Sequence, residues 1–206
     1  MFQDALGKTD LNPEQKQIAD YLARSAESLS NILSELLEIS RLNADVEQPS
    51  RRTLLAEEIF HRIDAEFSPL AAVRGLRFKF FYPQQATVLL TDRKMLLSLL
   101  RNLIDNAFKY TETGGVLVAL RRRGDHAVIQ VWDTGIGIAP AHIDAIFDEY
   151  FQVGNPQRDR ASGLGLGLAI VRRLANALGC QISCRSRLAR GSLFEFRVPL
   201  SDQANR

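Results

Sequence analysis

The segment Asn102-Leu-Ile-Asp-Asn106-Ala-Phe-Lys109-Tyr110 indicates how this chain folds and where its chemistry lies. It ends a predicted helix over residues 93–110. One face of that helix is apolar, with Leu96, Leu99, Leu100, Leu103 and Ala107. Because Asn102, Asn106 and Lys109 are spaced by four and three residues, they share a polar face opposite the leucines. The segment therefore predicts an amphipathic helix that is buried on one side.

The polar face of this helix has the residue types of a metal and phosphate site. A neutral side-chain carbonyl suits Mg²⁺, which accepts few protein ligands and keeps water and phosphate oxygens. Asn106 is the candidate ligand, and Lys109 can place a point charge on a phosphate. The alternative is an ordinary solvated helix face.

A second stretch, Asp133-Thr-Gly135-Ile-Gly137, follows a predicted strand over residues 127–133. A carboxylate at such a place can accept a hydrogen bond from an exocyclic amine, which distinguishes adenine from guanine. The two glycines permit positive φ and close approach of a ligand to the backbone. A plain turn with Asp and Gly as turn formers is the alternative.

A third stretch, Gly163-Leu-Gly165-Leu166-Gly167-Leu168, joins a polar loop at 152–162 to a predicted helix. Glycines expose backbone N–H groups, and a helix N-terminus attracts anions. The stretch lacks both the Gly-Lys-Ser/Thr ending of a P-loop and the spacing of a dinucleotide fold. Arg158 and Arg160 in the loop could reach a terminal phosphate, or could simply be solvated.

A long helix is predicted to precede these motifs. Asn12-Pro13-Glu14-Gln15 is a capped helix start, and no glycine or proline follows until after Asn43. The apolar seam has the alternating four and three spacing of a helix bundle, at Leu22, Ala26, Leu29, Leu33 and Leu36. We expect homodimerisation through the helix at 13–44. A helix folded onto its own domain is the alternative.

The remainder predicts an α+β fold, a two-layer α/β sandwich with helices on one face of a mixed, largely antiparallel sheet. A linker at 47–52 follows the first helix. Helices are expected at 54–67, 93–110, 141–151 and 164–178. Strands are expected at 76–82, 87–91, 115–122, 127–133, 182–188 and 192–200.

Composition excludes several classes of protein. The chain has 206 residues, and its net charge of +2 gives no strong field for nucleic acid or a membrane. The run Arg121-Arg122-Arg123 is interpreted as a solvated strand end, with a phosphate or partner patch as the alternative. Two cysteines, Cys180 and Cys184, predict free, buried or half-buried thiols in a reducing compartment. No span or signal peptide is evident, so a cytoplasmic location is expected.

Taken together, the motifs resemble the ATP-binding Bergerat fold of the GHKL superfamily, and within it the catalytic domain of bacterial sensor histidine kinases. Residues 102–110 resemble the N box, 133–137 the G1 box, 147–151 the F box and 163–167 the G2 box. The stretch Leu36-Leu-Glu-Ile-Ser-Arg-Leu42 resembles the end of the second helix of a dimerisation and histidine-phosphotransfer domain.

This resemblance implies a division of the chain. Residues 1–46 would be part of that dimerisation region, with its second helix at about 13–44. Residues 47–52 would be the linker, 53–200 the catalytic ATP-binding domain and 201–206 a tail. The cofactors would be ATP and Mg²⁺, and the reaction would be transfer of the γ-phosphate to a histidine.

The resemblance also implies residue roles. Asn106 would hold Mg²⁺ with help from Asn102, Asp133 would bind the adenine amine, and residues 152–162 would form a lid. The remaining nucleotide contacts would come from Lys109, Tyr110, Gly135, Gly137, Arg158, Arg160, Gly163, Gly165, Leu166, Gly167, Leu168 and Ser192.

One element of that family is not found. None of His61, His126 and His142 has the sequence context of a phosphoacceptor. We therefore expect a fragment that begins after the histidine helix and is unable to phosphorylate itself in cis. Its partners would be a phosphoacceptor histidine domain and the receiver domain of a response regulator. The alternatives are another GHKL branch, such as a serine kinase or a large ATPase, and a non-enzymatic ATP-sensing scaffold.

Overall fold

The computed structural model describes residues 12–43, 48–152 and 164–201. The first element is helix α2, Pro13–Asn43, which confirms the helix predicted from the sequence. Its start is a reciprocal capping box. The backbone N–H of Gln15 donates to Asn12 Oδ1 at 2.8 Å, and the backbone N–H of Asn12 donates to Gln15 Oε1 at 3.0 Å. Two backbone donors that a helix start leaves without partners are thereby satisfied.

A five-stranded sheet forms one layer of the domain, in the order β2-β4-β5-β7-β6. β2 runs parallel to β4, and every other pair is antiparallel, which confirms the predicted mixed sheet. The strands are β2 (Arg77–Phe81), β4 (Gly115–Arg123), β5 (His126–Asp133), β6 (Ile182–Arg187) and β7 (Gly191–Pro199).

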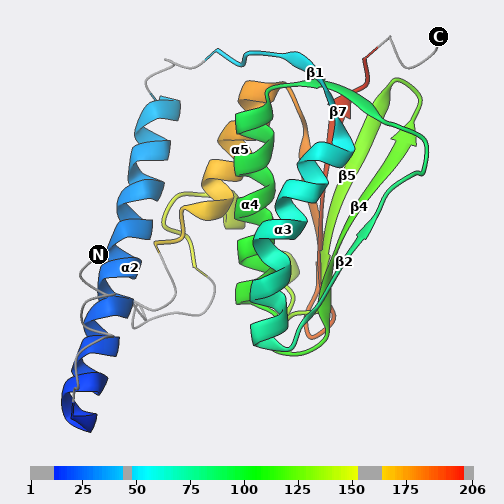
Figure 1. The fold of residues 1–206 in the computed structure, drawn as a ribbon. Helices are drawn as coiled ribbons and strands as arrows, with labels where there is room; N and C mark the ends of the chain where they lie inside the picture. Colours follow the sequence, from blue (N-terminus) through cyan, green and yellow to red (C-terminus); the bar gives the residue numbers. More distant parts are fainter. Residues whose placement is uncertain (1–11, 44–47, 153–163, 202–206) are drawn as a thin grey trace.

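Three helices cover one face of this sheet, as Figure 1 shows. They are α3 (Ala56–Arg74), α4 (Arg93–Lys109) and α5 (Gly167–Leu178). The core lies between the two layers, and its fully buried side chains include Phe60, Leu96, Leu103, Ile129 and Phe196. Each such side chain stabilises the fold by roughly 1.5–3 kcal/mol before the entropy of ordering is counted. This packing fixes the position of α4, whose polar face carries Asn102 and Asn106.

A small second sheet was not predicted. β1 (Arg52–Leu55) pairs antiparallel with β3 (Val88–Thr91), so β3 is not in the main sheet. The prediction of a linker through residue 52 and a helix from residue 54 was therefore wrong at this point. The four-residue strand is too short for its alternation to be distinguished from the helix that follows. Its pairing depends on a partner more than thirty residues away, with Leu54 opposite Leu89.

Two further helix predictions need correction. Residues 141–151 do not form one helix but two 3₁₀ turns, η1 (Pro140–His142) and η2 (Ala145–Phe147). Helix α5 begins at Gly167 rather than at residue 164. Gly165 has φ of +75°, which no α-helix accommodates, so the helix cannot extend back through it. Of the loop predicted at 152–162, all but residue 152 lies outside the described residues.

Helix α2 contacts α5 and otherwise stands apart from the domain (Figure 1). Its exposed large apolar side chains include Leu22, Leu29 and Leu33, each more than half exposed. The contact with α5 leaves these three side chains exposed, so dimerisation through α2 stays a prediction. Among the described residues, no helix is both long and apolar enough to cross a membrane. Cys180 is buried and Cys184 half-buried, and both are free thiols, as expected.

Candidate functional site

The end of β5 packs against the end of α4, which brings two of the three motifs together. The backbone N–H of Ile136 donates to the carbonyl oxygen of Tyr110 at 3.1 Å. Gly135 lies so close that an added Cβ would be 2.2 Å from the same oxygen. Only glycine permits this approach, because real Cβ atoms do not come so near to a carbonyl. Gly135 is therefore required for packing, in addition to any ligand contact.

The start of α5 packs against the polar face of α4, which adds the third motif. A Cβ on Gly167 would lie 3.2 Å from Asn106 Nδ2 and 3.4 Å from Asn102 Oδ1. Asn102 is oriented by its own helix, since its Nδ2 donates to the carbonyl oxygen of Ser98 at 3.0 Å. The acceptor oxygen of Asn102 is thus directed toward the helix start. Stretches that lie about thirty residues apart in the sequence converge here.

Asn106 is a half-buried polar side chain of this junction. Its Nδ2 atom is buried and has no hydrogen-bond partner among the described residues. Buried polar atoms almost always have a partner, and leaving one without costs about 1–3 kcal/mol. The two ends of an amide are assigned from the hydrogen-bond network, so the group can present either an oxygen or an N–H to a ligand. An amide in this state fits the Mg²⁺ ligand that the sequence predicts.

Asp133 ends β5 beside the same cavity. Its Oδ1 accepts hydrogen bonds from the backbone N–H of Gly135 at 2.8 Å and of Ser192 at 3.2 Å. Burial raises the pKa of this carboxyl above its ordinary value, while the bonds from Gly135 and Ser192 oppose the rise. Both backbone donors use Oδ1, and the side chain of Ser192 also hydrogen-bonds the carboxylate. A carboxylate has about four lone-pair sites, so it can accept a further hydrogen bond from a ligand.

The cavity between these elements has a volume of about 160 Å³. Its wall is mostly apolar, and its polar groups come from α4, β5, β7 and Gln152 of the loop that follows η2. This combination is typical of sites for flat, partly apolar ligands such as a purine ring. The described residues that line it are Asn106, Ala107, Tyr110, Asp133, Ile136, Gly137, Ile138, Ile146, Phe151, Gln152, Leu168, Ser192 and Phe194.

Several lining residues were not identified from the sequence, among them Ile138, Ile146 and Phe194. Ile136 and Ile138 flank Gly137, so alternation of apolar residues with glycine was the available signal. Gly137 itself has φ of +70°, and a Cβ there would lie 2.1 Å from the carbonyl oxygen of Arg187. The glycine turn is therefore held against the β6–β7 hairpin as well as against α4.

The other predicted contacts differ in where they lie: Tyr110 lines the cavity, whereas Lys109 does not. Lys109 and Tyr110 are exposed, and Lys109 Nζ lies 5.0 Å from the centroid of the Tyr110 ring. Leu166 is fully buried, so a contact from it is limited to its backbone. The first N–H groups of α5 have no acceptor within the helix, and no side chain caps them. Arg158, Arg160 and Gly163 lie outside the described residues.

Ser192 is fixed by a small network at the start of β7. Its hydroxyl lies 3.0 Å from that of Ser186, which also donates to the carbonyl oxygen of Gly191 at 2.9 Å. Ser186 Oγ in turn accepts from the backbone N–H of Ile138 at 2.8 Å. The network therefore holds the cavity wall and the hairpin together.

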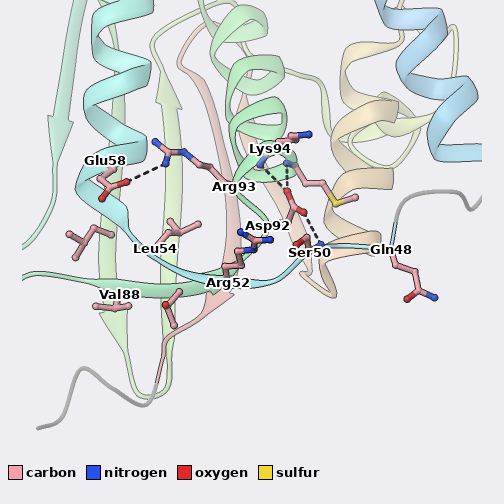
Figure 2. A pocket seen from close by; sticks show the side chains of 12 residues that line it. Gln48, Ser50, Arg52, Leu54, Glu58, Val88, Asp92, Arg93 and Lys94 are labelled. Atoms are coloured by element: carbon pink, nitrogen blue, oxygen red, sulfur yellow. Dashed lines mark hydrogen bonds and ion pairs between the residues drawn. The ribbon is translucent and has the colours of Figure 1, made fainter.

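A larger hollow, of about 720 Å³, lies at the other end of α4, between the chain that follows α2 and the small β1–β3 sheet (Figure 2). Asp92 organises it. Its Oδ1 caps α4 by accepting from Lys94 N at 2.8 Å and Met95 N at 3.1 Å, and its Oδ2 accepts from Ser50 N at 2.8 Å. None of the predicted site residues that the structure describes lines this hollow, so it is separate from the cavity.

None of the three histidines lines the cavity wall in the described part of the chain. His61 is exposed on α3, His126 lies 2.6 Å from Asp125 in a hairpin turn, and the ring of His142 packs 5.7 Å from that of Phe151. His61 is thus a surface residue, as predicted.

Comparison with known proteins agrees with this geometry. Residues 91–202 match the family described as histidine kinase-, DNA gyrase B-, and HSP90-like ATPase. The sensor histidine kinase RcsC of Escherichia coli strain K12 is 31% identical over 198 residues, which are 96% of this chain and 21% of RcsC. The chain therefore spans about a fifth of the length of that relative.

Solved structures show the same fold. The crystal structure of full-length ShkA in complex with AMPPNP has a TM-score of 0.80 and 29% identity over 97% of this chain and 42% of ShkA. Histidine kinase ThkA in complex with response regulator protein TrrA has a TM-score of 0.73 and 22% identity over 100% of this chain and 57% of that one.

The chain belongs to the histidine kinase-, DNA gyrase B-, and HSP90-like ATPase family. More particularly, it has the ATP-binding catalytic fold of histidine kinases and is homologous to sensor histidine kinases, which are ATP-dependent protein-histidine kinases. The predicted family and fold class are thereby confirmed.

Proposed function

We propose that the cavity between α4, β5 and α5 binds Mg-ATP, and that the domain transfers the γ-phosphate to a histidine carried by a separate phosphoacceptor domain. The single observation that carries the proposal is the convergence of three motifs around Asn106. Gly135 contacts the end of α4, and Gly167 contacts Asn106 itself. The residue types that meet there suit three components of Mg-ATP: the base, the phosphates and the divalent ion.

The adenine ring would lie in the apolar part of the cavity. Asp133 supplies an acceptor for the exocyclic amine, and its orientation is set by Gly135 and Ser192 before any ligand arrives. Ile138 and Phe151 supply apolar wall. A base with a carbonyl in place of the amine would set an acceptor against this half-buried carboxylate instead of a donor, which disfavours guanine by the cost of an unpaired polar group.

The phosphates would extend toward the start of α5. Backbone N–H groups of Gly167 and Leu168 point out of that helix start, and its dipole favours negative charge. Lys109 adds a positive charge at the rim. From outside the described residues, Gly163, Arg158 and Arg160 are further proposed contacts. Gly165 and the backbone of Leu166 complete the turn.

The amides of Asn106 and Asn102 would hold Mg²⁺, which when bound neutralises charge on the transferring phosphate. Apart from holding the ion, the residues of the domain contribute to the reaction by positioning the nucleotide. The protein contributes no nucleophile, and rate is gained by holding the phosphate chain in line with the acceptor nitrogen. The acceptor histidine lies outside this chain, because none of its three histidines lines the cavity.

We further propose that the domain works in a two-component system in the cytoplasm. The contact between ThkA and its response regulator supports a receiver domain as a partner. A homodimer through α2 would cover the leucine seam that α5 leaves exposed. These statements concern a protein longer than this chain.

The decisive experiment is phosphotransfer in trans. The chain is mixed with labelled ATP, Mg²⁺ and a separately expressed phosphoacceptor domain from a related kinase, and acid-labile label on the acceptor is measured. Labelling that disappears with Asn106→Ala supports the proposal. ATP binding without any labelling would contradict the kinase assignment, whereas rapid hydrolysis without an acceptor would instead favour an ATPase.

A further inference from the structure

The five-stranded sheet has a second face, which the helices do not cover (Figure 1). Side chains alternate between the two faces of each strand. In β5, the residues with odd numbers from Ala127 to Val131 belong to the core beneath the helices. The residues with even numbers, including Gln130 and Trp132, therefore belong to the other face, which we call the open face. The pairing register extends this division to the neighbouring strands.

The open face is strongly basic. Seven basic side chains lie on it, and every one is exposed: Arg77, Lys79, Arg121, Arg123, Arg185, Arg187 and Arg197. Glu195 is the single carboxylate among the strand residues of this face. The whole chain has a net charge of only +2, so positive charge is concentrated here and the rest of the molecule is more acidic. The run of three arginines found in the sequence contributes two of the seven.

An apolar strip crosses the open face toward the end of β5 that carries Trp132. The register places Leu117 and Leu193 directly opposite Trp132 on the two neighbouring strands. Leu193 is buried and Leu117 half-buried, so Trp132 is the exposed apolar side chain of the strip. Trp132 is 42% exposed, although it is the largest apolar side chain of the protein. Lys79 pairs with Leu117 at one end of the row, and Arg185 pairs with Leu193 at the other. An apolar patch with a polar rim is the usual anatomy of a protein interface, and Trp and Arg are enriched among the residues that carry most of the binding energy.

A carboxylate sits beside the apolar strip. Glu195 accepts a hydrogen bond from Gln130 Nε2 at 2.5 Å and lies 3.5 Å from the guanidinium of Arg185. A polyanionic chain or a lipid headgroup layer laid across the sheet would pass over this negative charge. A protein partner can place a cation or an N–H group opposite it. The position of Glu195 therefore favours a folded protein over a nucleic acid or a membrane.

We propose that the open face docks a second protein whose surface is rich in carboxylates around an apolar centre. Charge complementarity selects the partner, and Trp132 anchors it. A second copy of this chain does not fit the open face, because a symmetric pair would set arginine against arginine. Nor does the open face belong to the nucleotide cavity, which lies on the helical side of the same sheet. The partner surface is thus distinct from the proposed kinase site.

Trp132 makes the proposal directly testable, because it is the only tryptophan in the chain. Its fluorescence reports on the open face without any label. The probe is a short synthetic peptide in which glutamates surround leucine and phenylalanine, titrated in the absence of nucleotide. We expect the peptide to cause a blue shift of the emission. The apparent affinity for the peptide should fall at least tenfold when NaCl is raised from about 0.05 M to about 0.5 M.

Charge reversal separates the open face from the rest of the surface. Arg121→Glu with Arg197→Glu should weaken the response to the peptide at least tenfold. The matched control is Arg62→Glu, an exposed arginine on α3 on the opposite side of the domain, which should leave the response unchanged. If the charge-reversal variant is misfolded by circular dichroism, Arg121→Gln with Arg197→Gln replaces it, with a smaller loss expected.

Three results would overturn the proposal. The first is an absence of any change in Trp132 fluorescence with the acidic peptide. The second is equal weakening by Arg62→Glu and by the variants of the open face. The third is tighter binding to oligodeoxythymidine, or to vesicles of phosphatidylserine in phosphatidylcholine, than to the peptide, which would assign the open face to a nucleic acid or a membrane.

Discussion

The backbone N–H of Ser192 donates to Oδ1 of Asp133 at 3.2 Å, so the first residues of β7 hold the carboxylate that ends β5. The strands approach closely here. A Cβ on Gly191 would lie 1.9 Å from the carbonyl oxygen of Asp133. The side chain is thereby preorganised, and a ligand meets a carboxylate whose direction the fold has already fixed.

Asp133→Asn should lower ATP affinity about 100-fold and remove the preference for ATP over GTP. The substitution keeps the shape of the side chain but places an N–H₂ group where the adenine amine needs an acceptor. Calorimetric titration with both nucleotides measures the effect. Asp64→Asn, at an exposed carboxylate of α3, is the control and should leave both affinities unchanged. Undiminished selectivity in Asp133→Asn would remove Asp133 from the site.

Asn106→Ala should abolish measurable Mg-ATP binding without unfolding the domain. Within the described part of the chain the amide has no partner for its Nδ2, so its removal costs the fold little. Binding in the presence of Mg²⁺ or of EDTA separates the metal contribution from that of the base. Asn176→Ala, on an exposed turn of α5, serves as the matched substitution. Equal affinity for Mg-ATP in Asn106→Ala and in the unaltered chain would contradict the assignment.

Gly191→Ala should destabilise the domain by more than about 3 kcal/mol, or prevent its folding. Gly191 has φ of +90° and no room for a methyl group beside Asp133. Gly124 also has positive φ, of +60°, but nothing lies within 4 Å of an added Cβ. Gly124→Ala should therefore cost only about 1 kcal/mol. Urea unfolding of the two variants measures the difference. Similar losses of unfolding free energy in both would show that the close approach of Gly191 to Asp133 does not determine the cost.

Asp105→Asn should alter the pH dependence of stability. Burial raises the pKa of Asp105 from 3.8 to about 6, helped by the negative charge of Glu66, so the folded state binds more protons than the unfolded state between those values. Stability contributed by the protonated form is present below about pH 4 and lost as the pH rises through about 6. In Asp105→Asn, this loss of folding stability with rising pH should be absent.

At pH 7 the same variant should be more stable by about 1 kcal/mol. The full shift would correspond to roughly 3 kcal/mol, but Asp105 is partly exposed and solvent screens its charge. Thermal unfolding between about pH 4 and about pH 8 tests both parts. A curve parallel to that of the unaltered chain would refute the prediction.

Leu22→Asp with Leu29→Asp should dissociate the proposed dimer. The two side chains are 60% and 58% exposed, and burying charges in their place is unfavourable. Sedimentation equilibrium over a range of concentrations measures the oligomeric state. Gln17→Asp, also exposed on α2, should leave it unchanged. A monomer at every concentration before any substitution would contradict dimerisation through α2.

The sequence predicted those parts of the fold that have strong local periodicity. The leucine spacing in α4 and the apolar run in β5 determine a helix and a strand whatever surrounds them. The antiparallel pairing of β4 with β5 followed from the turn at Gly124 and Asp125, whereas the pairing of β5 with β7 was not predicted. The start of helix α2 could be predicted because the two residues of its capping box, Asn12 and Gln15, are close in the sequence.

What could not be predicted depends on contacts between distant residues. β1 exists because Leu54 meets Leu89, and no local pattern encodes that pairing. In the site, Asn106 and Asp133 were found because their motifs are compact. Ile146 and Phe194 were missed because they reach the cavity only through tertiary packing. Single apolar residues carry no sequence signal of which surface they will line.

Trp132 and Asp133 are consecutive in β5, and strand alternation sends them to opposite sides of one layer. A nucleotide on one side and an acidic protein on the other would therefore not compete for space. Both could be held at once, separated by the thickness of a single backbone. Tryptophan emission would then register events on either side of that layer, and a shared strand gives the two binding reactions a common physical element through which each can influence the affinity of the other.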